Sequence, residues 1–133
     1  MEKIALSPST LPPAPGYSQI VKVSGGGTTI YIAGQVALDE EGQLVGEGDL
    51  EKQARQVFTN LGTALSEAGA TPSDLVKIGI YVVDHDLDKL KLVRRVRDEV
   101  LDVDPPPAST LLGVERLALP EFLIEVDAIA VVE

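Results

Sequence analysis

The stretch that most constrains the fold is the C-terminal one, residues 105–132, which reads PPPASTLLGVERLALPEFLIEVDAIAVV. Its composition and its Ala118–Glu121 turn predict two β-strands joined at that turn. Strand residues alternate between two faces, so the parity of a position assigns it to one side of the sheet. Every even position of the second strand is apolar: Phe122, Ile124, Val126, Ala128, Ala130 and Val132. That face therefore belongs to the hydrophobic core.

The odd face of the same strand is unusual because three of its five positions, Leu123, Ile129 and Val131, are also apolar. A solvent-exposed face would be mostly polar, so we expect this face to be covered as well. Glu125 and Asp127 share it. Carboxylates on a partly buried face are paired, hydrogen-bonded or functional, because leaving a charge in apolar surroundings is costly.

Three further segments have the pattern of strands. Residues 18–23 and 28–33 are short runs rich in β-branched residues, and we interpret Ser24 with the three glycines 25–27 as a hairpin turn between them. Residues 75–83 place apolar side chains at alternate positions, as a strand does. A proline-rich extended arm, residues 11–16, precedes the first of these strands.

Two segments have the apolar stripe of a helix, one running from Asp49 to Gly69 and one over residues 87–101, with Asp49 and Asp86 as N-caps. The order is then β-β-α-β-α-β-β, which predicts a single α+β domain over residues 1–133. In this sandwich the sheet is on one side and the two helices are on the other. We expect a second copy of the chain to cover the other sheet face, with ligand sites in the clefts between subunits.

The composition excludes several classes of function. Cysteine is absent, which excludes thiol catalysis, thiolate metal sites and disulfides and fits a cytoplasmic location. The formal net charge of −10 disfavours nucleic acid as a partner, because an acidic surface repels phosphates. The chain start lacks the pattern of a signal peptide and no apolar run reaches the length of a membrane span, so we expect no membrane partner.

Two acidic segments have only a superficial likeness to metal sites. The segment at 39–42 lacks the glycine and the final glutamate of a calcium loop, because leucines stand at those positions. The single histidine, His85, lies between Asp84 and Asp86, and three consecutive residues at a strand end cannot all point at one ion. We therefore predict no metal, and we assign 84–86 to a polar loop before the second helix.

The second helix carries five of the eleven basic residues of the chain, at Lys89, Lys91, Arg94, Arg95 and Arg97. Such a concentration is found in anion-binding faces and also in solvated surfaces. Asp98 and Glu99 follow within about one helical turn and can pair with these cations. We interpret the helix as a solvated, ion-paired surface.

Several segments, taken together and in this order, resemble the YjgF/Rid (RidA) family: Gly16–Gln19, Tyr31–Gln35, Gln53–Gly69, Pro107–Thr110, Leu119–Pro120 and Ile124–Ala130. The resemblance covers nearly the whole chain. It implies a chorismate-mutase-like α+β fold and a homotrimer with sites in the clefts between subunits. It also implies hydrolysis of reactive imines and enamines to a 2-oxo acid and ammonia, without a cofactor.

The resemblance also implies the site residues. Glu125 matches the cleft glutamate that positions the attacking water and is the candidate catalytic residue. Tyr17 matches the cleft tyrosine, and Gly34 matches a backbone donor. Imine-deaminating members carry an arginine after the Pro-Ala pair, which clamps the substrate carboxylate. In this chain Ser109 stands at that position and is followed by Thr110.

Serine cannot replace a charge-assisted contact worth about 1.5–3 kcal/mol per hydrogen bond, so a 2-imino acid should bind poorly. Three alternatives are open. The cleft accepts an uncharged imine, with Ser109 and Thr110 as donors, or another cation, such as Arg116 or a basic residue of the second helix, reaches it. In the third alternative the protein is a regulatory trimer that binds a small metabolite without turnover. Endoribonuclease activity, known for some relatives, is disfavoured by the acidic charge and the single histidine.

Overall fold

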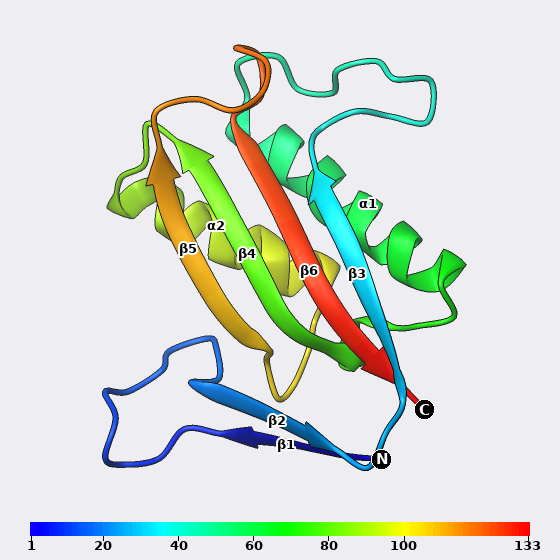
Figure 1. Ribbon diagram of the computed structural model, residues 1–133. Coiled ribbons are helices and arrows are strands. Elements are labelled where there is room, and N and C mark those ends of the chain that lie inside the picture. The colour runs from blue at the N-terminus through cyan, green and yellow to red at the C-terminus, as the bar shows by residue number, and fades with distance from the viewer.

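The computed structural model describes residues 1–133, and its central element is strand β6 (Ile124–Val132). This strand lies antiparallel between β3 (Thr28–Gln35) and β4 (Leu75–Val83). Strand β5 (Ala108–Val114) runs parallel to β4 and forms the edge of the sheet, so the strand order is β3-β6-β4-β5 (Figure 1). Even positions of β6 from Ile124 to Ala130 are buried, which confirms the parity assignment.

The two strands of the C-terminal stretch are joined along the chain but are not neighbours in the sheet. β4 lies between them. The elements β4, α2 and β5 form a β-α-β unit, and such a helical crossover makes the two strands parallel. The connection over residues 115–123 then carries the chain past β4, so that β6 enters between β4 and β3.

The first two strands, β1 (Glu2–Leu6) and β2 (Ile20–Ser24), form a separate antiparallel pair. In Figure 1 this pair lies across the end of the larger sheet, near the start of β5. The sequence predicted β2 but not β1, a five-residue segment with no turn signal before it. The predicted hairpin at 24–27 is wrong, because β2 and β3 belong to different sheets. Gly25, Gly26 and Gly27, all at positive φ, redirect the chain between those sheets.

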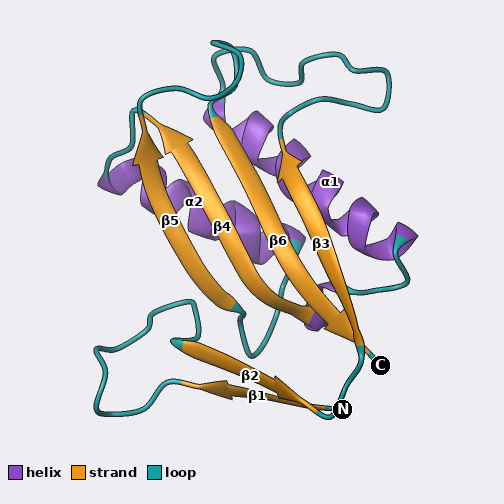
Figure 2. Cartoon of the chain, in the orientation of Figure 1, coloured by secondary structure: helices purple, strands orange, loops and turns teal.

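The two helices, α1 (Leu50–Glu67) and α2 (Leu87–Val100), cover one face of the four-stranded sheet (Figure 2). Both predicted N-caps are present, with carboxylates that accept backbone N–H bonds of 3.0 Å at Asp49 and 2.8 Å at Asp86. A 3₁₀ turn, η1 (Pro72–Asp74), leads into β4. Neither helix combines the length and apolar character that crossing a bilayer requires.

The hydrophobic core lies between the helices and the sheet. Buried side chains of β4 and β6 meet the apolar stripes of both helices, among them Val57, Phe58, Leu61, Ile78, Ile80, Val82, Val93 and Val96. The predicted α+β sandwich, with a sheet on one side and two helices on the other, is confirmed.

One buried polar side chain, that of Gln53 on α1, connects the core to two loops. Its amide nitrogen donates to the carbonyl oxygens of Gly46 and Glu121, and its amide oxygen accepts from the N–H of Leu123, all within 3.0 Å. A buried amide is tolerated when its hydrogen-bonding groups are satisfied in this way. Gln53 thus holds the loop before α1 and the entry to β6 in place.

Candidate functional site

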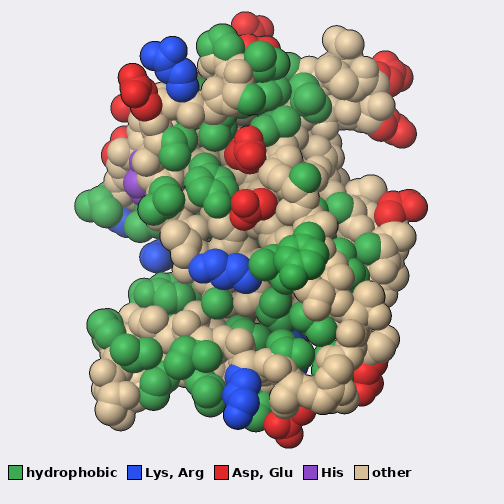
Figure 3. All heavy atoms as spheres, in the orientation of Figure 1, with side chains coloured by type: hydrophobic (Ala, Val, Ile, Leu, Met, Phe, Trp, Pro, Cys, Tyr) green, Lys and Arg blue, Asp and Glu red, His purple; other side chains and the backbone are tan.

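The sheet face that the helices leave uncovered carries the acidic residues of β6. Positions 125, 127, 129 and 131 alternate with the buried positions, so their side chains lie on this open face. Glu125 and Asp127 are half-buried there even in a single chain. Figure 3, which views this face, shows acidic side chains among hydrophobic ones. The sequence prediction of an acid-bearing, partly apolar face is therefore correct.

The side chain of Glu125 lies directly over Gly34. Strand β3 has a register shift between Ile32 and Gln35, which brings Gly34 opposite the carboxylate. A Cβ atom at Gly34 would collide with the carboxylate and lie only 2.7 Å from its Cδ atom. The absence of a side chain at position 34 is thus what gives Glu125 its position. This contact unites two of the predicted site residues.

A tyrosine that sequence reasoning did not select stands next to these acids. Tyr81 is the cross-strand partner of Glu125, and its hydroxyl donates a 3.2 Å hydrogen bond to Oδ2 of Asp127. The ring passes over Gly79, where a Cβ atom would lie 2.7 Å from the hydroxyl oxygen. Burial and the neighbouring carboxylates of Asp127 and Glu125 raise the pKa of Tyr81. The phenol therefore stays protonated as a donor.

Thr110 belongs to the same open face, because it pairs in register with Gly79. Its hydroxyl accepts a 2.9 Å hydrogen bond from the ammonium group of Lys77. The open face therefore carries one cation beside its acids, held by Thr110. This contact was not foreseen from the sequence.

Ser109 lies on the opposite side of the sheet from Thr110. It pairs in register with Ile78, a core residue, so its side chain faces the helices. There Ser109 and Tyr17 line a cavity of about 290 Å³ together with Arg94 and Arg97 of α2. The predicted ligand contacts Tyr17 and Ser109 are thus brought together, but away from Glu125.

Tyr17 reaches this cavity because the residue after it ties the proline-rich arm to the start of β5. Ser18 is buried, its hydroxyl donates to the carbonyl of Pro106 at 2.5 Å, and its N–H donates to that of Pro107 at 3.1 Å. The prolines before Tyr17 limit the conformations of the arm, so its ordering costs less entropy.

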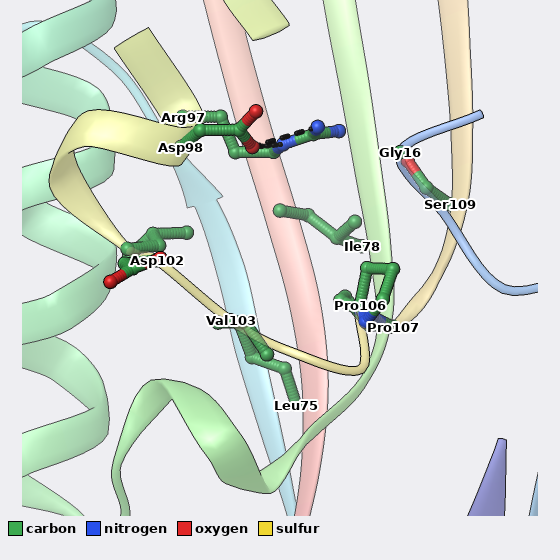
Figure 4. Close-up of a pocket in the computed structure, with 11 residues that line it drawn as sticks. Gly16, Leu75, Ile78, Arg97, Asp98, Asp102, Val103, Pro106, Pro107 and Ser109 are labelled. Carbon is green, nitrogen blue, oxygen red and sulfur yellow. Dashed lines mark hydrogen bonds and ion pairs between the residues drawn. The ribbon is translucent and has the colours of Figure 1, made fainter. Parts of the chain in front are cut away.

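Arg94 and Arg97 line this cavity, whereas the sequence analysis predicted that the basic residues of the second helix lie on a solvated surface. The Arg97 side chain is only 14% exposed, and its guanidinium pairs with Asp98 at 2.9 Å, as seen in Figure 4, which draws the adjoining pocket that shares Arg97 and Ser109 with this cavity. Arg94 is half-buried. The spacing of three residues places both on one helix face, and this spacing was the available signal. The interpretation holds better for Arg95, which pairs with Glu51 of α1 and with Glu99 one turn on in α2.

Arg116, the remaining predicted contact, lies in the loop after β5. Its side chain is 80% exposed and pairs with the neighbouring Glu115 at 3.6 Å. It does not line the cavity at Ser109. It also does not line the surface groove between the end of β3, at Gly34, and α1. The structure does not bring Arg116 to the other site residues of the chain.

The candidate residues therefore form two groups separated by the sheet. Glu125, Gly34 and Thr110 lie on the open face, whereas Tyr17 and Ser109 lie on the helix side at the β5 edge. A single chain does not place Glu125 and Ser109 in one cleft. A cleft that used both groups would need a second copy of the chain.

The same architecture is found in solved structures of Rid proteins. The Rid family protein YyfB of Yersinia pestis superimposes with a TM-score of 0.90 at 40% identity, covering 99% of this chain and 100% of that chain. RidA of Psychrobacter sp. PAMC 21119 superimposes with a TM-score of 0.70 at 30% identity, covering 97% and 99%. The fold and its acid-bearing open face thus define a Rid-type α+β protein.

The sequence relatives agree with this class. Residues 8–132 match the family model described as Endoribonuclease L-PSP. A RutC family protein of Synechocystis is 35% identical, covering 90% of this chain and 89% of the relative. A protein of Dermatophagoides farinae named 2-iminobutanoate/2-iminopropanoate deaminase is 29% identical, covering 99% and 98%. The chain belongs to the YjgF/Rid family.

Proposed function

We propose that the protein is a cofactor-independent deaminase that hydrolyses small imines or enamines, with Glu125 as the catalytic residue. The observation that carries the proposal is the placement of the Glu125 carboxylate over Gly34, on a face crowded by apolar side chains. Membership of the Rid family and the similarity to a protein named as a 2-imino acid deaminase support it.

The chemistry requires one proton acceptor that later returns the proton. Water attacks the imine carbon while Glu125 takes one of its protons and passes it to the imine nitrogen, which forms the carbinolamine R₂C(OH)NH₂. Glu125 then takes the proton of the hydroxyl group and delivers it to the amino nitrogen, the carbon–nitrogen bond breaks, and ammonia leaves a carbonyl product. An enamine first gains a proton on carbon to give the same imine. No electrons are exchanged, so the reaction R₂C=NH + H₂O → R₂C=O + NH₃ balances without an oxidant.

We further propose that the working form is a homotrimer whose clefts combine the two groups of residues. The open face carries apolar side chains beside its acids, including Tyr31, which is 78% exposed in the single chain. Such a face is suited to burial against another copy. Glu125 of one copy would then face the Tyr17 and Ser109 cavity of the next, which supports a shared cleft.

Turnover is tested with two imines generated in place: 2-iminopropanoate, which an amino acid oxidase forms from alanine, and an uncharged imine, which an amine oxidase forms from a primary amine. Glu125→Gln should lower the rate by about 10²–10⁴-fold, the usual contribution of a general base. Asp127→Asn is the matched control, because it removes the same charge from the same face and should keep most of the activity.

Two results would contradict the proposal. One is a Glu125→Gln variant as active as the wild type. The other is a wild-type protein without turnover of either imine but with a saturable thermal shift on metabolite addition, which would favour the regulatory trimer instead.

A further inference from the structure

The cavity on the helix side of the sheet has charged features for which the proton-transfer role of Glu125 gives no use. It measures about 290 Å³, and its walls come from α2, from β4 and β5, from the loop at His85 and from the arm at Tyr17. Such a volume suits a molecule of a few carbon atoms, because sites for drug-sized ligands begin at about 300 Å³.

The first feature is a guanidinium with no internal partner. Arg94 lines the cavity, and every other arginine of the chain makes an ion pair: Arg55, Arg95, Arg97 and Arg116. In a chain of net charge −10, a half-buried arginine without a carboxylate neighbour is unexpected. Arg97 beside it is mostly buried but keeps Asp98 as its partner. Two guanidiniums and one carboxylate leave one net positive charge.

The second feature is a buried histidine nitrogen. His85 also lines the cavity, and its Nδ1 atom is buried without any hydrogen-bond partner. A buried polar atom without a partner is rare and costs stability, so it calls for an explanation. The ring fits there only because Gly113 has no side chain: a Cβ atom at position 113 would lie 2.9 Å from Cβ of His85.

The remaining walls are apolar or hydroxylated. Ile80, Leu90 and Leu111 form a hydrophobic side, while Ser109 and Tyr17 contribute hydroxyl groups. A ligand with one negative charge, one further acceptor and a short hydrocarbon chain would match all of these groups. Inorganic phosphate, which carries more charge and no apolar part, matches them less well.

We propose that this cavity binds a small 2-oxo or 2-imino monocarboxylate, with the carboxylate held by Arg94 and Arg97 of α2. Helix α2 then supplies the guanidinium that Ser109 lacks, from the other wall of the same cavity. Binding as such does not depend on turnover. Only the identification of the ligand as the substrate or product of the deaminase rests on the proposed function.

Binding is measured by saturation-transfer NMR and calorimetry with pyruvate as the stable probe, next to acetone and inorganic phosphate. The wild type should bind pyruvate saturably and more tightly than the other two. Arg94→Met should weaken pyruvate binding by at least about 10-fold, since a charge-assisted contact is lost. Arg95→Met is the matched control, because it removes the same charge from the same helix but faces α1, and it should leave binding unchanged.

Arg97→Met should weaken binding as well. Arg97 packs within 3.0 Å of the Gly16 position and pairs with Asp98, so this variant could lose stability. Arg94 makes no such contacts, so its variant keeps the test valid if Arg97→Met does not fold. Absence of pyruvate binding, equal binding of acetone or phosphate, or unchanged binding in Arg94→Met would each overturn the proposal. Glu125→Gln should lose turnover but keep pyruvate binding, so failure of the binding proposal and failure of the proposed reaction are distinguished.

Discussion

The two sides of the sheet carry opposite chemistry. On the open side, Glu125 and Asp127 stand among apolar residues, with Tyr81 as a hydroxyl donor. On the helix side, Arg94 and Arg97 line a cavity at the edge of β5. One sheet thus presents carboxylates on one face and guanidinium groups on the other. Because the sheet separates them, a reaction that needs both requires two copies of the chain.

The difference also explains why Ser109 is compatible with an anion site. The cavity already contains two guanidiniums from α2, and a third at position 109 would add like charge in a confined space. In the proposed site the carboxylate would be held from the helix that faces the strand. On this account the missing arginine of β5 is compensated rather than simply lost.

The largest expected effect is on the open face. In Gly34→Ala, the new methyl group would displace the Glu125 carboxylate. Turnover should fall by about 10²-fold, as is common when a catalytic group is moved by roughly 1 Å. Pyruvate binding in the cavity should not change. Steady-state rates and NMR titration of the same sample separate the two effects.

The control for this variant is Gly62→Ala, at a position on α1 where a Cβ atom meets nothing within 4 Å. Turnover should be unchanged, and stability should rise slightly because alanine favours helix. A Gly34→Ala protein with wild-type turnover would show that the contact with Gly34 does not position Glu125.

The next effect concerns the cavity alone. In Gly113→Ala, the new methyl group would push His85 away from its position. Pyruvate binding should weaken by roughly 10-fold, in the range of one lost hydrogen bond with a charged ligand. Turnover of an uncharged imine should stay close to the wild-type rate. Loss of that turnover would show that the cavity acts in the reaction itself and not in carboxylate binding alone.

A smaller effect is expected for Tyr81→Phe, which removes the hydrogen bond to Asp127. The free energy of unfolding should drop by about 1 kcal/mol at neutral pH. The raised pKa of Tyr81 means that the folded state holds the phenol proton more tightly than the unfolded state does. That stabilisation is complete below the ordinary value of 10.0 and is lost as the pH rises through the folded-state value. Denaturation curves of the two proteins should therefore converge at alkaline pH, and curves that stay parallel would contradict the assignment.

The smallest effect is expected on stability at low pH. It concerns the ion pairs that join α1 to α2, which lie on the outer surface of the helices and not at either face of the sheet. Hydrogen bonds from Arg95 to Glu51 and from Arg55 to Glu99 are the main reason that the pKa values of both carboxyls are lowered. Groups with lowered pKa values stabilise above the ordinary value of 4.5 and lose that effect as the pH falls through the folded-state value. In the double variant Glu51→Gln and Glu99→Gln, the melting temperature should fall less steeply than that of the wild type as the pH drops below 4.5. The difference should be small, because exposed ion pairs contribute little to stability. An unchanged acid profile would exclude them as a stabilising group.

The sequence predicted the layers of the fold because each element has a strong local signal. The even positions of β6 are all apolar, and Asp49 and Asp86 are good caps. The pairing of the strands was harder to predict. Strand β4 enters between β5 and β6 through a crossover, and no local pattern reports a contact between distant strands.

The site was predictable in part for a related reason. Parity placed Glu125 on the sheet face opposite the core, where the structure has it, and the family resemblance selected Gly34 and Tyr17. The cavity was missed because a basic helix face looks the same in a sequence whether it meets water or a pocket. Only the packing of α2 against β5 shows that Arg94 has no carboxylate partner and that His85 Nδ1 is buried.

The most direct test of a site shared between copies is subunit complementation. Glu125→Gln and Arg94→Met proteins are each assayed with 2-iminopropanoate, then mixed, unfolded and refolded together. If each cleft takes Glu125 from one copy and Arg94 from the next, about a quarter of all clefts in the refolded trimers are intact, since each of the two positions is wild type half of the time. Activity should rise to roughly that share of the wild-type value. A mixture that stays as inactive as its two components would contradict a cleft built from the two sides of the sheet.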